Sequence, residues 1–175
     1  MADRRGLALW ATSLPHQLAA FSAVHLGGVL VGITLLPLRT RTGGTGAPIV
    51  AGATATSLFA TNSKLVAITF LVSLCTGGVA AIVIVGVNGI RYGLALAAAT
   101  PAVAPTNFAD RLMAITFPWL EFIALIGMAT LGALLFWRLW FSARPIGARL
   151  LTGVSVGSVA CLWLAAGMEA RVLGT

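Results

Sequence analysis

The feature that most constrains this chain is its succession of long apolar runs. Only 9% of the residues are charged and 59% are hydrophobic, and the mean hydropathy is +1.00. A helix needs about 20 mostly apolar residues to cross a hydrocarbon core of roughly 30 Å. Four runs reach that length, over residues 9–38, 64–90, 111–140 and 146–172. Because backbone groups in lipid must pair within their own segment, the runs predict an all-α bundle of four transmembrane helices.

The length of the chain leaves little room outside these spans. In 175 residues, four spans and their connections form a single integral membrane domain over 1–175, without a separate soluble domain. The net charge is +7, but the basic residues stand singly or in pairs at the ends of apolar runs, where their side chains reach lipid headgroups. This pattern argues against nucleic-acid binding. The basic residues divide too evenly between the two sides to set an orientation.

The connections are predicted from glycine, proline and hydroxyl residues. Residues 43–48 break the first helix, 49–63 are expected to form a loop with a short interfacial helix, and 92–109 are expected to form a second loop. Asp110 and Glu169 are assigned to regions outside the spans. Trp10, Trp137 and Trp140 lie at span boundaries, where the amphipathic indole ring is typical of an interfacial anchor.

Small residues one helical turn apart predict close helix contacts. Such spacing opens a flat groove that lets another backbone approach. It occurs in three spans, at Gly28 and Gly32, at Ser73 and Gly77, and at Gly153 and Gly157. The contact is either within the chain or with another subunit, and both options stay open. A small-residue face is also compatible with a pigment, a quinone or a lipid tail, and bound lipid is expected in any case.

Glu121 is the most unusual residue, because it lies near mid-depth in the third predicted span. An ionised carboxylate there costs several kcal/mol, so the group should be protonated, paired or hydrated. Pro118 precedes it by three residues and removes a backbone donor. One interpretation is that Glu121 fixes helix geometry through a hydrogen bond. The other is that it handles protons or ions.

His25 lies near mid-depth in the first predicted span, whereas His16 lies near one end. Nine residues at about 100° each place the two rings on opposite faces, so they cannot ligate one haem. Haem b ligation by His25 with Met128 or Met168, or a haem shared between two copies, stays open. The alternative is that His25 hydrogen-bonds a carbonyl, Ser or Glu across a helix interface. Its depth matches that of Glu121, so a pairing between them is a hypothesis. No residue set predicts a metal site.

The stretch from His25 through Gly27 and Gly28 to the exit at Pro37 and Arg39 resembles the first helix of small copper-resistance-type bacterial membrane domains. The resemblance covers about one span of four. It implies a helical membrane domain, but no second His or Met cluster supports copper binding.

The chain shows no catalytic motif and no cluster of titratable residues along the sequence, so an accessory subunit is a better expectation than an enzyme. We therefore expect a small non-catalytic integral membrane subunit of a larger respiratory or photosynthetic electron-transport complex. Its expected partners are other membrane subunits and lipids, in a bacterial or mitochondrial inner membrane. The alternatives are an electron-transfer subunit that binds haem b or quinone at His25, and a proton- or ion-conducting protein built on Glu121.

Overall fold

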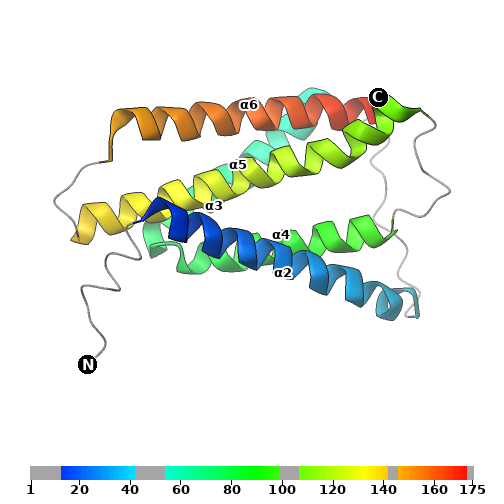
Figure 1. The fold of residues 1–175 in the computed structure, drawn as a ribbon, viewed down its shortest axis with the longest axis horizontal. Helices are drawn as coiled ribbons and strands as arrows, with labels where there is room; N and C mark the ends of the chain where they lie inside the picture. Colours follow the sequence, from blue (N-terminus) through cyan, green and yellow to red (C-terminus); the bar gives the residue numbers. More distant parts are fainter. Residues whose placement is uncertain (1–12, 42–53, 99–106, 142–145, 173–175) are drawn as a thin grey trace.

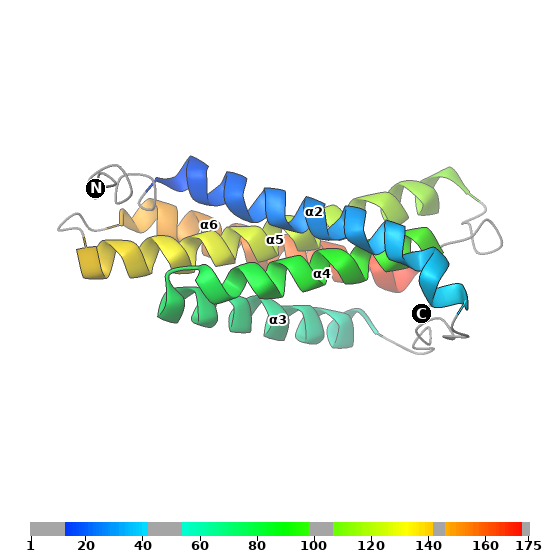
Figure 2. The same cartoon turned by 90° about the horizontal axis from the view of Figure 1, so that it is seen from below.

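The computed structural model describes residues 13–41, 54–98, 107–141 and 146–172, and within these ranges the chain is helical. The helices are α2 (Leu14–Arg41), α3 (Ala55–Thr76), α4 (Val79–Ala98), α5 (Phe108–Phe141) and α6 (Ala148–Val172). They lie along one long axis and alternate in direction (Figures 1 and 2).

The predicted all-α membrane bundle is confirmed. Four helical stretches in the described residues are long and apolar enough to cross a membrane: Leu14–Leu35, Ala55–Thr76, Phe108–Phe141 and Ala148–Val172. A shorter apolar stretch, Val79–Leu94, belongs to α4. The predicted span at 9–38 begins partly outside the described residues, and the spans predicted at 111–140 and 146–172 correspond closely to α5 and α6.

The single helix predicted over 64–90 is wrong, because the structure divides this range into α3 and α4. Gly77 and Gly78 form the turn between them, with φ of 62° and 92°. These left-handed backbone values suit glycine, since a side chain there would collide with the following carbonyl. Gly77 is also the C-cap of α3, and its amide donates to the Ser73 carbonyl. The two helices therefore form a hairpin.

The loop expected over 49–63 is also corrected where it is described, since residues 55–63 belong to α3. Thr54 caps this helix, and its side-chain oxygen accepts from the Ser57 amide at 3.2 Å. The hydroxyls of Ser57 and Thr61 donate to backbone carbonyls one turn earlier, at 2.8 and 2.9 Å. Their polarity is thus satisfied within the helix. Similarly, α4 continues to Ala98 inside the second expected loop.

The extra helix changes the topology of the bundle. With four spans, the two ends of the chain would lie on one side, whereas here α2 begins at one end of the bundle and α6 ends at the other (Figure 1). We call the end with the Gly77–Gly78 turn the hairpin end. The opposite end, where α6 reaches Arg171 and α5 begins, is the Arg171 end. The helices α2 and α4 both run from the hairpin end to the Arg171 end, so they are parallel neighbours (Figure 2).

The centre of the bundle is formed by α5. Its residues from Ala124 to Leu134 are largely buried, and Phe21, Val66, Val85 and Leu162 pack into the same core from the other four helices. This core lies on the hairpin side of Glu121. The polar and titratable side chains of the candidate site lie on the other side of this core, toward the Arg171 end.

Candidate polar site within the bundle

Glu121 lies inside the bundle and is held by a side chain from another helix. It lies about 5 Å along α5 from the midpoint of that helix, at 1.5 Å per residue. The amide Nδ2 of Asn62, on α3, donates a hydrogen bond to Oε1 of Glu121. The two helices run parallel here, because Ser73 further along α3 donates to the Ala129 carbonyl of α5 at 2.5 Å. The carboxyl group is therefore fixed between α3 and α5 at mid-depth.

Two further titratable groups interact electrostatically with this carboxyl. Glu169 of α6 is close enough for its charge to interact with that of Glu121. Tyr92 of α4 is also within electrostatic reach. Glu169 lies inside α6, contrary to its predicted place outside the spans, and its Oε2 is buried without a hydrogen-bond partner. Asn62, Tyr92 and Glu121 therefore bring polar side chains from three helices to one region, and Glu169 of α6 lies about 12 Å further toward the Arg171 end by the register of α5 and α6.

The fifth helix, α2, contributes His25 to this region. Its side chain is only 4% exposed. The ring bonds the backbone of Val85 across the interface with α4, while Nδ1 is buried without a hydrogen-bond partner. Since the partner is a carbonyl acceptor, Nε2 carries the proton and Nδ1 presents a lone pair. The ring lies 4.5 Å from that of Phe122 and 6.5 Å from that of Tyr92, between centroids.

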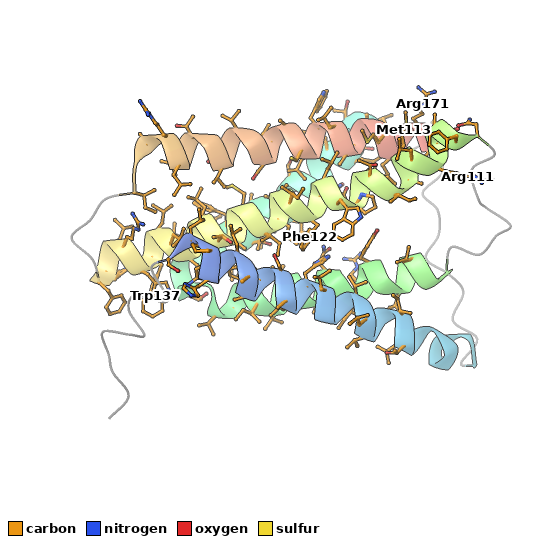
Figure 3. All side chains as sticks on the ribbon, in the orientation of Figure 1. Arg111, Met113, Phe122, Trp137 and Arg171 are labelled. Atoms are coloured by element: carbon orange, nitrogen blue, oxygen red, sulfur yellow. The ribbon has the colours of Figure 1, made fainter. Side chains whose placement is uncertain are left out.

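The suggested pairing of His25 with Glu121 is replaced by two separate contacts. Consecutive residues on a helix point about 100° apart. Glu121 therefore faces α3 and Asn62, while Phe122 faces α2 and the ring of His25. Figure 3 shows Phe122 between α5 and the pair formed by α2 and α4. The two titratable residues share a level in the bundle but face different helices.

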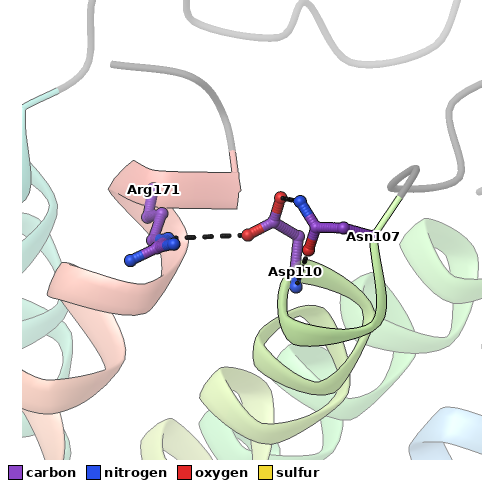
Figure 4. Close-up of polar contacts among 3 residues, drawn as sticks. All are labelled: Asn107, Asp110 and Arg171. Atoms are coloured by element: carbon purple, nitrogen blue, oxygen red, sulfur yellow. Dashed lines mark hydrogen bonds and ion pairs between the residues drawn. The ribbon is translucent and has the colours of Figure 1, made fainter.

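An ion pair lies at the Arg171 end of the bundle. Nε of Arg171 lies 3.5 Å from Oδ1 of Asp110, and the Asp110 side chain is further held by Asn107 at 2.5 Å (Figure 4). Asn107 also caps α5, because its Oδ1 accepts from the Asp110 amide at 2.8 Å. The ion pair joins the start of α5 to the end of α6. Glu169 lies one half-turn before Arg171, between this ion pair and Glu121.

The small residues predicted to pack have different surroundings. A Cβ at Gly28 would lie 2.4 Å from the Gly86 carbonyl oxygen, and one at Gly32 would lie 2.2 Å from that of Ile90, so both glycines contact α4 closely. Ser73 is buried against Gly132, whereas Gly77 is in the turn. A Cβ at Gly153 or Gly157 would meet nothing within 4 Å. Those two glycines have no close partner within the described chain.

The tryptophans expected to be anchors also differ from one another. Trp137 donates from Nε1 to the Gly77 carbonyl at 3.0 Å, so its polar edge binds the turn between α3 and α4. Trp140 is 74% exposed at the end of α5. Trp10 lies outside the described residues.

Several functional candidates were not found from sequence. The sequence predicts a loop at Asn62, a second loop at Tyr92, and a position outside the spans for Glu169. The sequence signal that could have identified Asn62 is its position, because a helix that starts at Ala55 places Asn62 seven residues inside a span. No described contact brings Met128 or Met168 to His25; Met128 packs against the core instead. Among the described residues, no group of three or more His, Cys, Asp or Glu side chains is arranged to hold a metal ion.

Comparison with known proteins adds no assignment to this geometry. No family model matches the chain, and neither the curated proteins nor the solved structures contain a significant match.

Proposed function

We propose that the protein is a small integral membrane subunit that binds and releases a proton at Glu121 within the bilayer. The observation that carries this proposal is the position of the Glu121 carboxyl inside the bundle near the middle of α5, where Asn62 of α3 donates a hydrogen bond to it. Intramembrane carboxyls are costly to retain, and they are typical of proton and ion pathways.

The surroundings of Glu121 support a proton more than a metal cation. Asn62 presents its amide donor to the carboxyl, and a donor repels a cation while it stabilises a carboxylate. Glu169 is a second carboxyl within electrostatic range of Glu121, further toward the Arg171 end. An ionised Glu121 is therefore stabilised locally by one hydrogen bond but opposed by a like charge, so proton binding changes the energy of the whole cluster.

Carbodiimide labelling tests this function. A hydrophobic carbodiimide such as dicyclohexylcarbodiimide reacts with protonated carboxyl groups inside apolar regions. We expect label on the peptide that contains Glu121, with labelling of that peptide that falls as pH rises and vanishes in Glu121→Gln. Glu169→Gln is the matched control, since it removes the neighbouring carboxyl and keeps the target. Absence of label on Glu121 throughout the pH range would contradict the proposal.

A second candidate function, an accessory role in a larger electron-transport complex, is favoured by the outer face of α6. Gly153, Gly157 and Gly167 leave open space at their α-carbons, and Val156 and Leu164 beside them are exposed. Small residues on an unpaired helix face are typical of contacts with another transmembrane helix. Native mass spectrometry after mild detergent extraction tests this role. A partner should co-purify with wild type and be lost from Gly157→Leu, whereas a lone monomer in both preparations would refute it.

A further inference from the structure

Lys64 is a charged residue in the middle of a membrane helix. The span expected at 64–90 would place it at a helix end, whereas α3 already begins at Ala55. At 1.5 Å per residue, the α-carbon of Lys64 lies about 2 Å from the midpoint of α3. Asn62 faces α5, where it bonds Glu121, and two further residues turn the helix by about 200°. Lys64 therefore points out of the bundle, and its side chain is exposed.

A second exposed cation, Arg91 of α4, lies at the same level. The hairpin of α3 and α4 turns at Gly77 and Gly78, and Lys64 precedes the first glycine by 13 residues, as Arg91 follows the second by 13. Since the two helices are antiparallel neighbours, both cations lie about 20 Å from the turn along the bundle. Neither has an ion-pair partner among the described residues.

Lipid headgroups do not account for a cation at this depth. A hydrocarbon core of about 30 Å centred on α3 would end about 13 Å from the α-carbon of Lys64, and the lysine stem covers only about 6 Å. On α5 the exposed apolar surface also continues past this level, since Leu112 and Ile115, which precede Glu121, are 54% and 62% exposed. Lys64 therefore lies within the apolar depth of the bundle.

The surface around Lys64 is suited to another helix. Charged side chains at this depth almost always face protein or water rather than lipid, and they pair with opposite charges. Ala60, Thr61 and Ala67 are exposed within one turn of Lys64. Such small side chains let another helix backbone approach closely, so that an acidic side chain on that helix could contact the ammonium group.

A second copy of this chain does not supply the negative charge. The carboxyl side chains in the described residues belong to Asp110, Glu121 and Glu169, and none of them is exposed. Asp110 is paired with Arg171, and Glu121 accepts from Asn62. The net charge of +7 adds repulsion between copies. The partner is therefore a different, acidic chain.

We propose that the outer surface of the α3–α4 hairpin docks a transmembrane segment of another membrane protein, with a carboxylate of that partner opposite Lys64. Arg91, at the same level on α4, offers a place for a second carboxylate. The carboxylate supplies the counter-charge that the described residues do not give Lys64. This contact is separate from the glycine face of α6, and it does not depend on proton binding at Glu121.

Carbodiimide coupling in native membranes tests the contact. A hydrophobic carbodiimide activates a carboxyl group, and an amine in contact with that group displaces the urea and forms an amide bond, with loss of a proton. We expect a peptide that contains Lys64 to be joined to an aspartate or glutamate in an apolar segment of a different protein. Mass spectrometry of the coupled peptides identifies both residues.

Two substitutions at Lys64 separate its charge from its amine. Lys64→Arg keeps the charge, but its guanidinium group does not form this amide bond, so the same partner should co-purify without the coupled peptide. Lys64→Met keeps a side chain of similar length without charge, and it should lower the recovered partner by about tenfold or more. Because Lys64 is exposed, Lys64→Met should unfold at the same SDS fraction as wild type, which separates loss of the partner from misfolding.

The proposal is overturned if wild type gives no coupled peptide, if Lys64 couples to a carboxyl of this chain, or if Lys64→Met recovers the partner in full. Retention of phosphatidylglycerol or cardiolipin by wild type but not by Lys64→Met, with no protein partner, would assign the surface to lipid instead. Carbodiimide label on Glu121 is scored in the same samples. Failure of the Lys64 contact therefore leaves the proposed proton binding to be judged by that label alone.

Discussion

The contact between α2 and α4 gives the sharpest quantitative prediction, for Gly93→Ala. A Cβ at Gly93 would lie 2.1 Å from the Val29 carbonyl oxygen and 3.0 Å from the α-carbon of Gly32. An ordinary carbon–oxygen contact is about 3.3 Å or more. The methyl group therefore requires the two helices to separate locally by about 1.2 Å, because neither neighbouring atom belongs to a side chain that can rotate away.

The expected cost follows from this separation. Overpacking of a well-packed interface costs about 1–3 kcal/mol. The weak Cα–H···O contacts along the helix pair, about 0.5–1 kcal/mol each, are stretched at the same time. We expect Gly93→Ala to lower the free energy of unfolding by about 2–3 kcal/mol, toward the upper end of the overpacking range.

Reversible unfolding by SDS in mixed micelles, followed by tryptophan fluorescence, measures this change. Gly157→Ala is the matched control, since it makes the same substitution in a membrane helix where a Cβ meets nothing within 4 Å. The control should be as stable as wild type or more stable by up to about 1 kcal/mol, because alanine is favoured over glycine inside a helix. If Gly93→Ala unfolds at the same SDS fraction as Gly157→Ala, α2 and α4 do not pack at backbone distance and the reasoning is refuted.

Three further predictions use the same unfolding assay. Asn62→Leu should destabilise the bundle by about 1–3 kcal/mol, because it leaves the Glu121 carboxyl without its hydrogen-bond donor. The double variant with Glu121→Leu should recover most of that loss. A double variant no more stable than Asn62→Leu would contradict this pairing. Trp137→Phe should cost about 0.5–1.5 kcal/mol through the lost bond to the Gly77 carbonyl, and no change would show that bond to be unimportant. Gly77→Ala should cost at least about 1–2 kcal/mol, because φ is 62° and a Cβ would lie 2.7 Å from the Phe136 ring; a neutral result would argue against the left-handed turn.

The sequence predicts helices in this chain better than it predicts where one helix ends. Length and apolarity identify α5 and α6, because long apolar segments in lipid have few alternatives to a helix. The same criterion does not detect the turn at Gly77 and Gly78, because hydropathy averaged over about 20 residues stays high when two glycines lie between apolar segments. A positive φ is a property of the folded turn, and the letters alone do not distinguish a capping glycine from a packing glycine.

The site was predicted in part for a related reason. Glu121 and His25 stand out as single polar residues in apolar runs, and the structure places both inside the bundle. The side chains that they contact depend on how each helix is rotated about its axis. A shift of one residue changes the direction of a side chain by about 100°. Asn62 was missed because hydroxyl-rich sequence before it suggested a loop. In the structure those hydroxyls bond the preceding turn, so the segment remains helical and carries Asn62 to Glu121.

The hydrogen bond from Asn62 to Glu121 bears on both readings of this carboxyl, the structural one and the proposed proton binding. If Glu121 served only to hold α3 against α5, an apolar pair of similar volume would hold them equally well, because a buried polar pair gains little over good packing. A carboxyl inside the bundle costs free energy that an apolar side chain of similar volume would not, and the charge of Glu169 adds to that cost when both groups are ionised. The proposed proton binding accounts for this cost, because the hydrogen bond from Asn62 lowers the energy of the ionised form of Glu121.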